Sequence, residues 1–176
     1  MRRASAIVTL TGTALGFLAA VGIAWFCEFR FNLTPSEPLG LWRIILLNRP
    51  ARNGDLVFVC PPESALFHKA LERGYLRRGL CRGGHAPLIK SVVATSGQHI
   101  KIDTHVTVDG TPVTSSAVRK SDGNGRPVSP FSGGVVPPGF IFLHSPFASS
   151  YDSRYFGPVP VSGVLGLARP VLVYNP

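Results

Sequence analysis

The stretch Leu88-Ile89-Lys90-Ser91-Val92-Val93-Ala94 decides the fold class of this 176-residue chain. Apolar residues fill it except at Lys90 and Ser91, a pattern typical of a buried β-strand. Lysine is rarely buried, because loss of water disfavours the ammonium and lowers its pKa. Lys90 is therefore either an exposed side chain on an alternating strand or a neutral amine at a catalytic site. The strand pattern alone favours the exposed side chain.

Short apolar runs on both sides of this stretch predict a mainly β, antiparallel domain with a small helical insertion. Further strands are expected at 42–47, 56–60, 99–103, 105–108, 140–143 and 163–174, with a hairpin turn at Asp109-Gly110. Apolar residues at helical spacing predict a helix within 63–76, part of an excursion at about 61–86. Two prolines and a glycine exclude a helix at 32–40 and predict a stiff, extended segment.

The first 27 residues indicate a membrane anchor. Arg2 and Arg3 precede residues 4–27, which carry no charge, and a helix of that length covers roughly 36 Å. We expect residues 1–27 to form a transmembrane helix with the arginines in the cytoplasm. Residues 28–176 would then be a periplasmic domain facing out from the bacterial inner membrane. The alternative is a cleaved signal sequence, with Gly22-Ile23-Ala24 offering small residues for cleavage and a soluble periplasmic product.

Net charge indicates which partners to expect, and the histidines and cysteines indicate whether a metal site or a disulfide is present. Residues 28–176 hold all nine acidic residues and all but two of the 18 basic ones, a net charge of +7. The basic residues are scattered, so we expect anionic phospholipid or an acidic partner and no nucleic acid. The five histidines show no metal-ligand spacing, and neither a metal nor another cofactor is expected. Cys60 and Cys81 are either two free thiols or a disulfide, worth roughly 3 kcal/mol in an oxidising compartment.

Three separated blocks resemble motifs of the signal-peptidase family, in that family's order. Thr34-Pro35-Ser36-Glu37-Pro38 resembles its nucleophile box, the Lys90 stretch its lysine box, and residues 150–159 its late acidic box. Glu37 stands where the housekeeping members have methionine. The series Asn32-x-Thr34-x-Ser36-x-Pro38-x-Gly40-x-Trp42 is similar to the TraF branch, the peptidases of bacterial conjugation.

This resemblance implies a signal-peptidase-like β fold and a serine/lysine-dyad peptidase that needs no cofactor. Ser36 would be the nucleophile and Lys90 its base, with the Ser36 N–H and the Thr34 hydroxyl binding the oxyanion. The supporting residues it implies are Ser150, which would orient Lys90 by a hydrogen bond, and an ion pair of Asp152 and Arg154. The substrate would be a pilin prepeptide, trimmed at its C-terminus and joined head to tail during plasmid transfer.

Three alternatives to pilin maturation stay open. The chain could be a non-catalytic periplasmic scaffold that contacts other proteins of a conjugation apparatus. It could instead be a general leader peptidase with broad substrates. A serine peptidase built on His144 and Asp152 is also conceivable, and retention of full turnover after Lys90→Ala would favour it.

Overall fold

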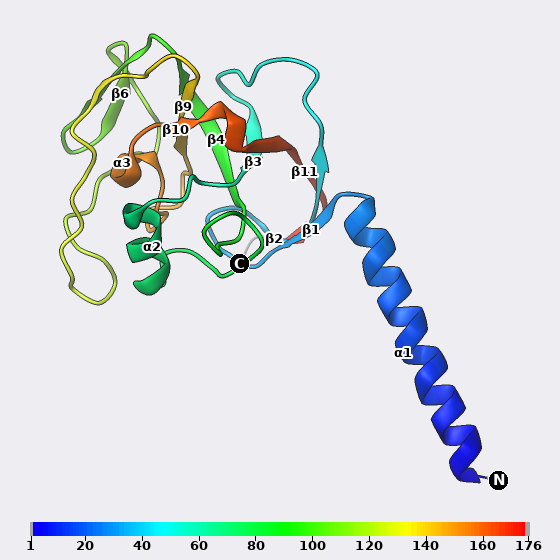
Figure 1. Cartoon of the computed structure of the whole chain (residues 1–176). Helices are drawn as coiled ribbons and strands as arrows, with labels where there is room; N and C mark the ends of the chain where they lie inside the picture. The colour runs from blue at the N-terminus through cyan, green and yellow to red at the C-terminus, as the bar shows by residue number, and fades with distance from the viewer. Residues whose placement is uncertain (1, 175–176) are drawn as a thin grey trace.

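A computed structural model describes residues 2–174 as a β body from which one helix projects (Figure 1). The side chains of residues 2–6, 8, 20, 24 and 25 lie outside that description. Helix α1 spans Arg2–Phe26, so the N-terminal segment is helical as expected. Among the described residues, however, no helix is both long and apolar enough to cross a membrane. The prediction of a transmembrane helix is not confirmed.

Seven strands form the main sheet in the order β1-β2-β11-β3-β4-β9-β10. Every pairing in it is antiparallel, which confirms the mainly β, antiparallel part of the predicted fold class. Its strands are β1 (Phe29–Asn32), β2 (Leu39–Ile45), β3 (Leu56–Val59), β4 (Leu88–Thr95), β9 (Phe140–His144), β10 (Val159–Pro160) and β11 (Val164–Tyr174). The stretch that contains Lys90 is β4, and it lies between β3 and β9.

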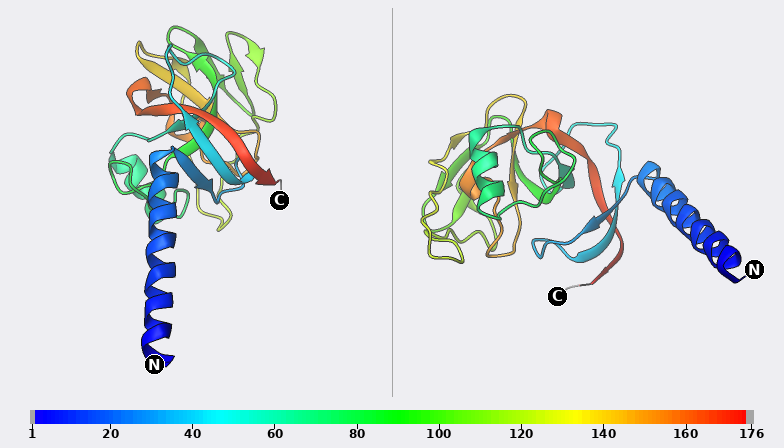
Figure 2. Two further views of the ribbon diagram at one scale, coloured as in Figure 1. Left: turned by 90° about the vertical axis from the view of Figure 1, so that its right-hand side faces the viewer. Right: turned by 60° about the horizontal axis from the view of Figure 1, so that its bottom comes forward.

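A smaller sheet and three short helices complete the body. The sheet has the order β7-β6-β5-β8, with β5 (His99–Ile102), β6 (Val106–Val108), β7 (Thr111–Pro112) and β8 (Gly134–Val135). The helices are α2 (Ala65–Glu72), α3 (Ser153–Phe156) and the 3-10 turn η1 (Val161–Gly163). Helix α2 confirms the small helical insertion, and Ser64 caps it by accepting a hydrogen bond from the Phe67 N–H. Two further views show α1 leaving the body beside β1 and β2 (Figure 2).

Three clusters of buried side chains hold the layers together. The first includes Phe67 of α2 and Leu143 of β9, and it seats the excursion on the main sheet. The second includes Ile100 and Phe142 and joins the two sheets. The third contains Trp42 and lies among β2, β3 and β4. Burying each large apolar side chain contributes about 1.5–3 kcal/mol, and the clusters leave β4 covered on both faces.

Residues 32–40 form a reversal of the chain, and the expectation of an extended segment is wrong. Strands β1 and β2 pair antiparallel with Asn32 opposite Gly40, so the chain turns within residues 34–37. The two prolines do exclude a helix, but Pro35 suits the second position of a tight turn. Residues 29–32, where no strand was expected, are an edge strand.

Candidate active site

Ser36 and Lys90 line one cavity of about 660 Å³. The turn between β1 and β2 brings Ser36 to it, and β4 brings Lys90. The other walls are residues 74–78 of the excursion, residues 86–88 where the excursion leads into β4, and the loop around residues 147–151. Within the described part of the chain, no hydrogen bond joins the Lys90 Nζ to the Ser36 Oγ, and such contacts are often loose before a substrate binds.

Lys90 is buried, with 2% of its surface exposed, so the exposed-side-chain interpretation is wrong. Both faces of β4 are covered: Ile89 packs in the Trp42 cluster, and Lys90 faces the cavity. Burial lowers the pKa of Lys90 to about 8, although the carboxylates of Asp152 and Glu37 oppose that shift. About a tenth of the molecules would therefore carry a neutral amine at pH 7, which is the form a general base requires.

The turn that carries Ser36 is held by a buried asparagine. The Asn32 amide donates to the carbonyls of Thr34, Glu37 and Pro38 at 2.9, 2.9 and 3.0 Å. Its Oδ1 accepts the Thr34 N–H and the Thr34 hydroxyl at 3.1 and 2.8 Å. One side chain thus binds the turn at five points, which gives Ser36 a defined position. Sequence reasoning placed Asn32 in the motif but assigned it no role.

The two expected oxyanion donors differ in whether they already donate a hydrogen bond within the protein. The Ser36 backbone N–H donates no hydrogen bond within residues 2–174, so it is available to an oxyanion. The Thr34 Oγ1 lies 3.4 Å from the Ser36 Oγ, but its proton is engaged by Asn32. Thr34 would have to rotate its hydroxyl away from Asn32 to donate to an oxyanion.

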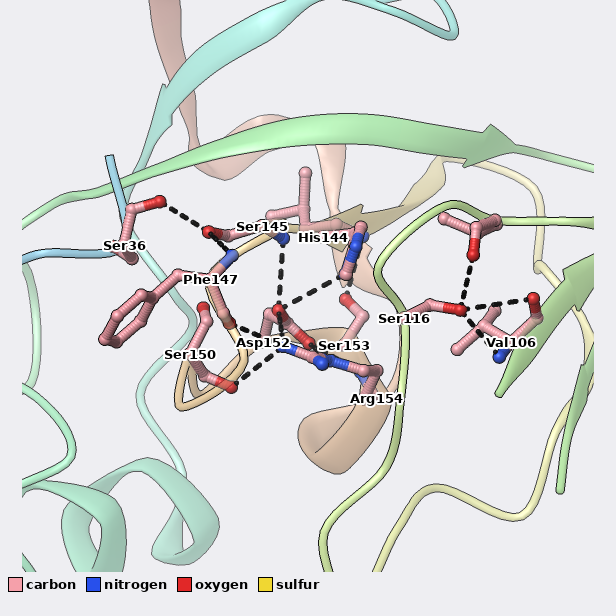
Figure 3. Close-up of polar contacts among 12 residues, drawn as sticks. Ser36, Val106, Ser116, His144, Ser145, Phe147, Ser150, Asp152, Ser153 and Arg154 are labelled. Carbon is pink, nitrogen blue, oxygen red and sulfur yellow. Dashed lines mark hydrogen bonds and ion pairs between the residues drawn. The ribbon is translucent and has the colours of Figure 1, made fainter. Parts of the chain in front are cut away.

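Asp152 and Arg154 form the expected ion pair in the interior (Figure 3). Arg154 Nε and Nη2 donate to the two Asp152 oxygens, both at 2.8 Å, and neither side chain is exposed. Burial alone would raise the pKa of Asp152, but hydrogen bonds from His144 and Arg154 bring it below its usual range. Asp152 therefore stays ionised, and its charge helps to hold a proton on Lys90.

Ser145 connects this ion pair to the candidate nucleophile (Figure 3). Its N–H donates to the Asp152 Oδ2 at 3.1 Å, and its hydroxyl donates to the Ser36 carbonyl. The sequence signal for this residue was its position in Leu143-His144-Ser145, the segment that precedes the late acidic box. Residue type alone gave no indication that Ser145 would reach a turn more than a hundred positions earlier in the chain.

The geometry does not favour a Ser/His/Asp arrangement. His144 Nδ1 lies 3.5 Å from the Asp152 Oδ2, and Nε2 lies 3.2 Å from the Thr114 carbonyl. The nitrogen that would deprotonate a serine is thus occupied elsewhere, and Lys90 is left as the candidate base in the cavity.

Two other residues of the cavity region differ from expectation. Ser150 lines the cavity, but its buried hydroxyl has no hydrogen-bond partner in the described residues, and the predicted bond to Lys90 is absent. The Ser150 backbone carbonyl, by contrast, accepts a hydrogen bond from the Arg154 Nη2 at 3.2 Å. Glu37, which sequence reasoning left without a role, has one buried, unpaired oxygen. Burial raises the pKa of Glu37, against the opposing charges of Lys90 and His144.

A disulfide joins Cys60 and Cys81, so the interpretation as two free thiols is wrong. It closes the base of the excursion, whose residues 74–78 form one cavity wall. Among the described residues, no group of three or more His, Cys, Asp or Glu side chains is arranged to hold a metal ion.

The antiparallel β fold and the serine–lysine cavity are what a serine hydrolase of the signal-peptidase type requires. The chain matches the family described as "Signal peptidase, peptidase S26" over residues 3–173, and it belongs to that family.

Within the family, the chain is similar to proteins of plasmid conjugation. It is 58% identical over 170 residues to a probable conjugal transfer protein TraF of Sinorhizobium fredii, covering 97% of this chain and 89% of the relative. It is 58% identical to the conjugal transfer protein TraF of Agrobacterium tumefaciens over the whole of both chains. A plasmid transfer protein TraF of Escherichia coli is 34% identical over 98% of each chain.

A solved structure of a signal peptidase I from Enterococcus faecalis aligns with a TM-score of 0.42 at 16% identity. The alignment covers 68% of this chain and 97% of that one.

Proposed function

We propose that this chain is a serine endopeptidase that uses Ser36 and Lys90 to mature a conjugative pilin subunit during plasmid transfer. The observation that carries the proposal is the buried Lys90 amine, with a pKa of about 8, in the cavity that also exposes Ser36. The conjugal-transfer names of the relatives support a role in plasmid transfer. Maturation would consist of C-terminal trimming followed by head-to-tail joining.

In the acylation step, neutral Lys90 takes the proton of the Ser36 hydroxyl while the Ser36 Oγ attacks the scissile carbonyl carbon. The Ser36 N–H, and Thr34 after rotation of its hydroxyl, stabilise the oxyanion. The Lys90 ammonium then protonates the leaving amine as the peptide C–N bond breaks. The products are an ester on Ser36, a free C-terminal tail and a neutral Lys90.

Two nucleophiles can resolve the ester. Water releases a linear, trimmed pilin, whereas the pilin's own α-amine forms a new peptide bond and a circular product. Lys90 serves as base for either nucleophile, and its proton returns to the Ser36 oxygen as the ester breaks. The circular product is one water lighter than the trimmed linear one, so mass alone separates the two outcomes.

Mass spectrometry of the candidate pilin, expressed with wild-type, Ser36→Ala or Lys90→Ala protein, tests the proposal. We expect the trimmed mass less one water with wild type and the unprocessed mass with both variants. Normal pilus assembly with Ser36→Ala would support a non-catalytic scaffold instead. Cleavage of ordinary preproteins at comparable rates by the purified protein would support a general leader peptidase.

We further propose that residues 28–176 work in the periplasm, at the inner membrane and beside other conjugation proteins. The Cys60–Cys81 disulfide supports this location, because such bonds persist in oxidising compartments. Thiol labelling of intact cells and of lysates, without reductant, tests it. Cys60 and Cys81 found reduced in cells would argue for the cytoplasm.

A further inference from the structure

Two neighbouring arginines line the cavity that contains Ser36 and Lys90. Arg77 and Arg78 belong to the excursion wall, and both side chains are exposed. Neither forms an ion pair with the described carboxylates, and no Asp or Glu lines the cavity. The cavity is therefore cationic, with guanidinium donors that have no carboxylate partner in the described part of the chain.

Some other arginines of the body have such a partner, although several, including Arg43 and Arg169, form no ion pair with the described carboxylates. Arg49 pairs with Asp55 at 2.7 Å, and Arg126 pairs with Asp122 at 2.6 Å. Two arginines without a carboxylate partner, on the wall of a cavity that no Asp or Glu lines, favour an anionic ligand.

The backbone beneath the two arginines is fixed. The Ala86 N–H donates to the Arg77 carbonyl at 2.7 Å, and the Gly79 N–H donates to the Gly84 carbonyl at 3.0 Å. Arg78 pairs with His85 in an antiparallel bridge, and the Cys60–Cys81 disulfide closes the segment. The backbone that carries the two side chains is thus ordered before a ligand binds, which reduces the conformational entropy lost on binding.

We infer that Arg77 and Arg78 form a subsite that binds a carboxylate of the peptide substrate. The carboxylate is either the C-terminal group of the tail that is removed or an acidic side chain within that tail. A guanidinium presents a planar fork of donors that matches a carboxylate in two parallel hydrogen bonds. The inference rests on the proposed peptidase function, because a peptide cut at Ser36 has to lie in the same cavity.

An anionic phospholipid would also suit two exposed arginines. The structure favours a peptide as the ligand, since Arg77 and Arg78 line the same cavity as Ser36 and Lys90. Binding of the two arginines to lipid would appear in the test below as weaker vesicle binding by the double Gln variant.

The test compares kcat/KM of the full-length chain on four synthetic peptides that span the C-terminal cut site of the candidate pilin. The peptides are the free acid, the C-terminal amide, a form with Asp and Glu replaced by Asn and Gln, and a form with both changes. We expect wild type to prefer the free acid or the acidic tail by about tenfold to a hundredfold, the usual strength of a charged hydrogen bond. The peptide change that abolishes the preference identifies which carboxylate binds to Arg77 and Arg78.

The Arg77→Gln/Arg78→Gln variant should lose this preference, mainly through KM. Arg82→Gln is the matched control, because Arg82 is exposed on the same segment but does not line the cavity. An Arg77→Glu/Arg78→Glu variant should reverse the preference towards a tail that carries lysine and an amidated end. Exposed positions of this kind tolerate substitution with little effect on folding.

Equal kcat/KM of wild type on all four peptides would overturn the subsite and leave the peptidase intact. Unchanged peptide kinetics in the double Gln variant, with weaker binding to phosphatidylglycerol vesicles, would assign the arginines to lipid and also overturn it. If wild type cuts none of the peptides and a neutral ester does not acylate Ser36, the proposed function fails and the subsite fails with it.

Discussion

Lys90→Met is expected to abolish turnover and, at neutral pH, to remove a cost in folding stability. Methionine has a similar length and suits the apolar β4 surroundings, but it cannot accept the Ser36 proton. Loss of a general base alone reduces the rate by roughly 100- to 10,000-fold. The stability effect follows from the pKa of Lys90, which falls from 10.5 to about 8 on folding.

The sign of the stability effect depends on pH. Below pH 8 both states hold the lysine proton, and the folded state bears the whole cost of the buried charge, about 3 kcal/mol for a shift of this size. Between pH 8 and 10.5 the unfolded chain binds more protons than the folded chain, so wild-type stability rises with pH. Methionine does not titrate. The free energy of unfolding of wild type minus that of Lys90→Met should therefore rise by about 2–3 kcal/mol from pH 7 to pH 10.

Urea unfolding of both proteins at pH 7 and pH 10 measures this difference, in a Cys27→Ser background that removes the free thiol. Packing differences between lysine and methionine cancel, because only the pH-dependent part is compared. Lys101→Met is the control, since the Lys101 side chain is 67% exposed and should show a much smaller change. The reasoning is refuted if the difference between wild type and Lys90→Met is the same at both pH values.

Three further predictions concern the neighbours of Lys90. Glu37→Gln removes a carboxylate that raises the pKa of Lys90, so the acidic limb of the kcat/KM profile should move to lower pH; an unmoved limb contradicts this. Thr34→Val should reduce kcat by about 100-fold or more with little change in KM, as for other lost oxyanion donors, and wild-type kcat in steady-state assays would exclude that role. Asp152→Asn breaks a fully buried ion pair and should lower the free energy of unfolding by about 3–5 kcal/mol in urea. Asp103→Asn, in an exposed pair, should cost about 1 kcal/mol or less.

Local patterns were sufficient for much of the fold. Apolar runs predicted the positions of β2, β3, β4 and β9 because a buried strand needs consecutive side chains that leave water. Helical spacing predicted α2 in the same way. Strand β1 was missed although its four residues alternate between apolar and polar, because so short an edge strand owes its structure to its partner.

The turn around Ser36 illustrates the limit of local reasoning. Its prolines correctly excluded a helix, but they allow both an extended chain and a turn. The five hydrogen bonds of Asn32 select the turn. An asparagine in an exposed position would have left the choice open, and its burial comes from the pairing of β1 with β2.

By itself, the sequence determined which residue types could do the chemistry and in what order they occur: a serine between prolines, a lysine in an apolar strand, and a late Asp–Arg pair. Only the tertiary structure decided that Lys90 faces a cavity instead of water, because whether both faces of β4 are covered depends on distant layers. It likewise decided that Ser145 would connect Asp152 to Ser36. Burial and hydrogen bonding are properties of assembled surfaces, so the pKa that makes Lys90 a candidate base exists only after the sheet, the turn and the excursion have packed together.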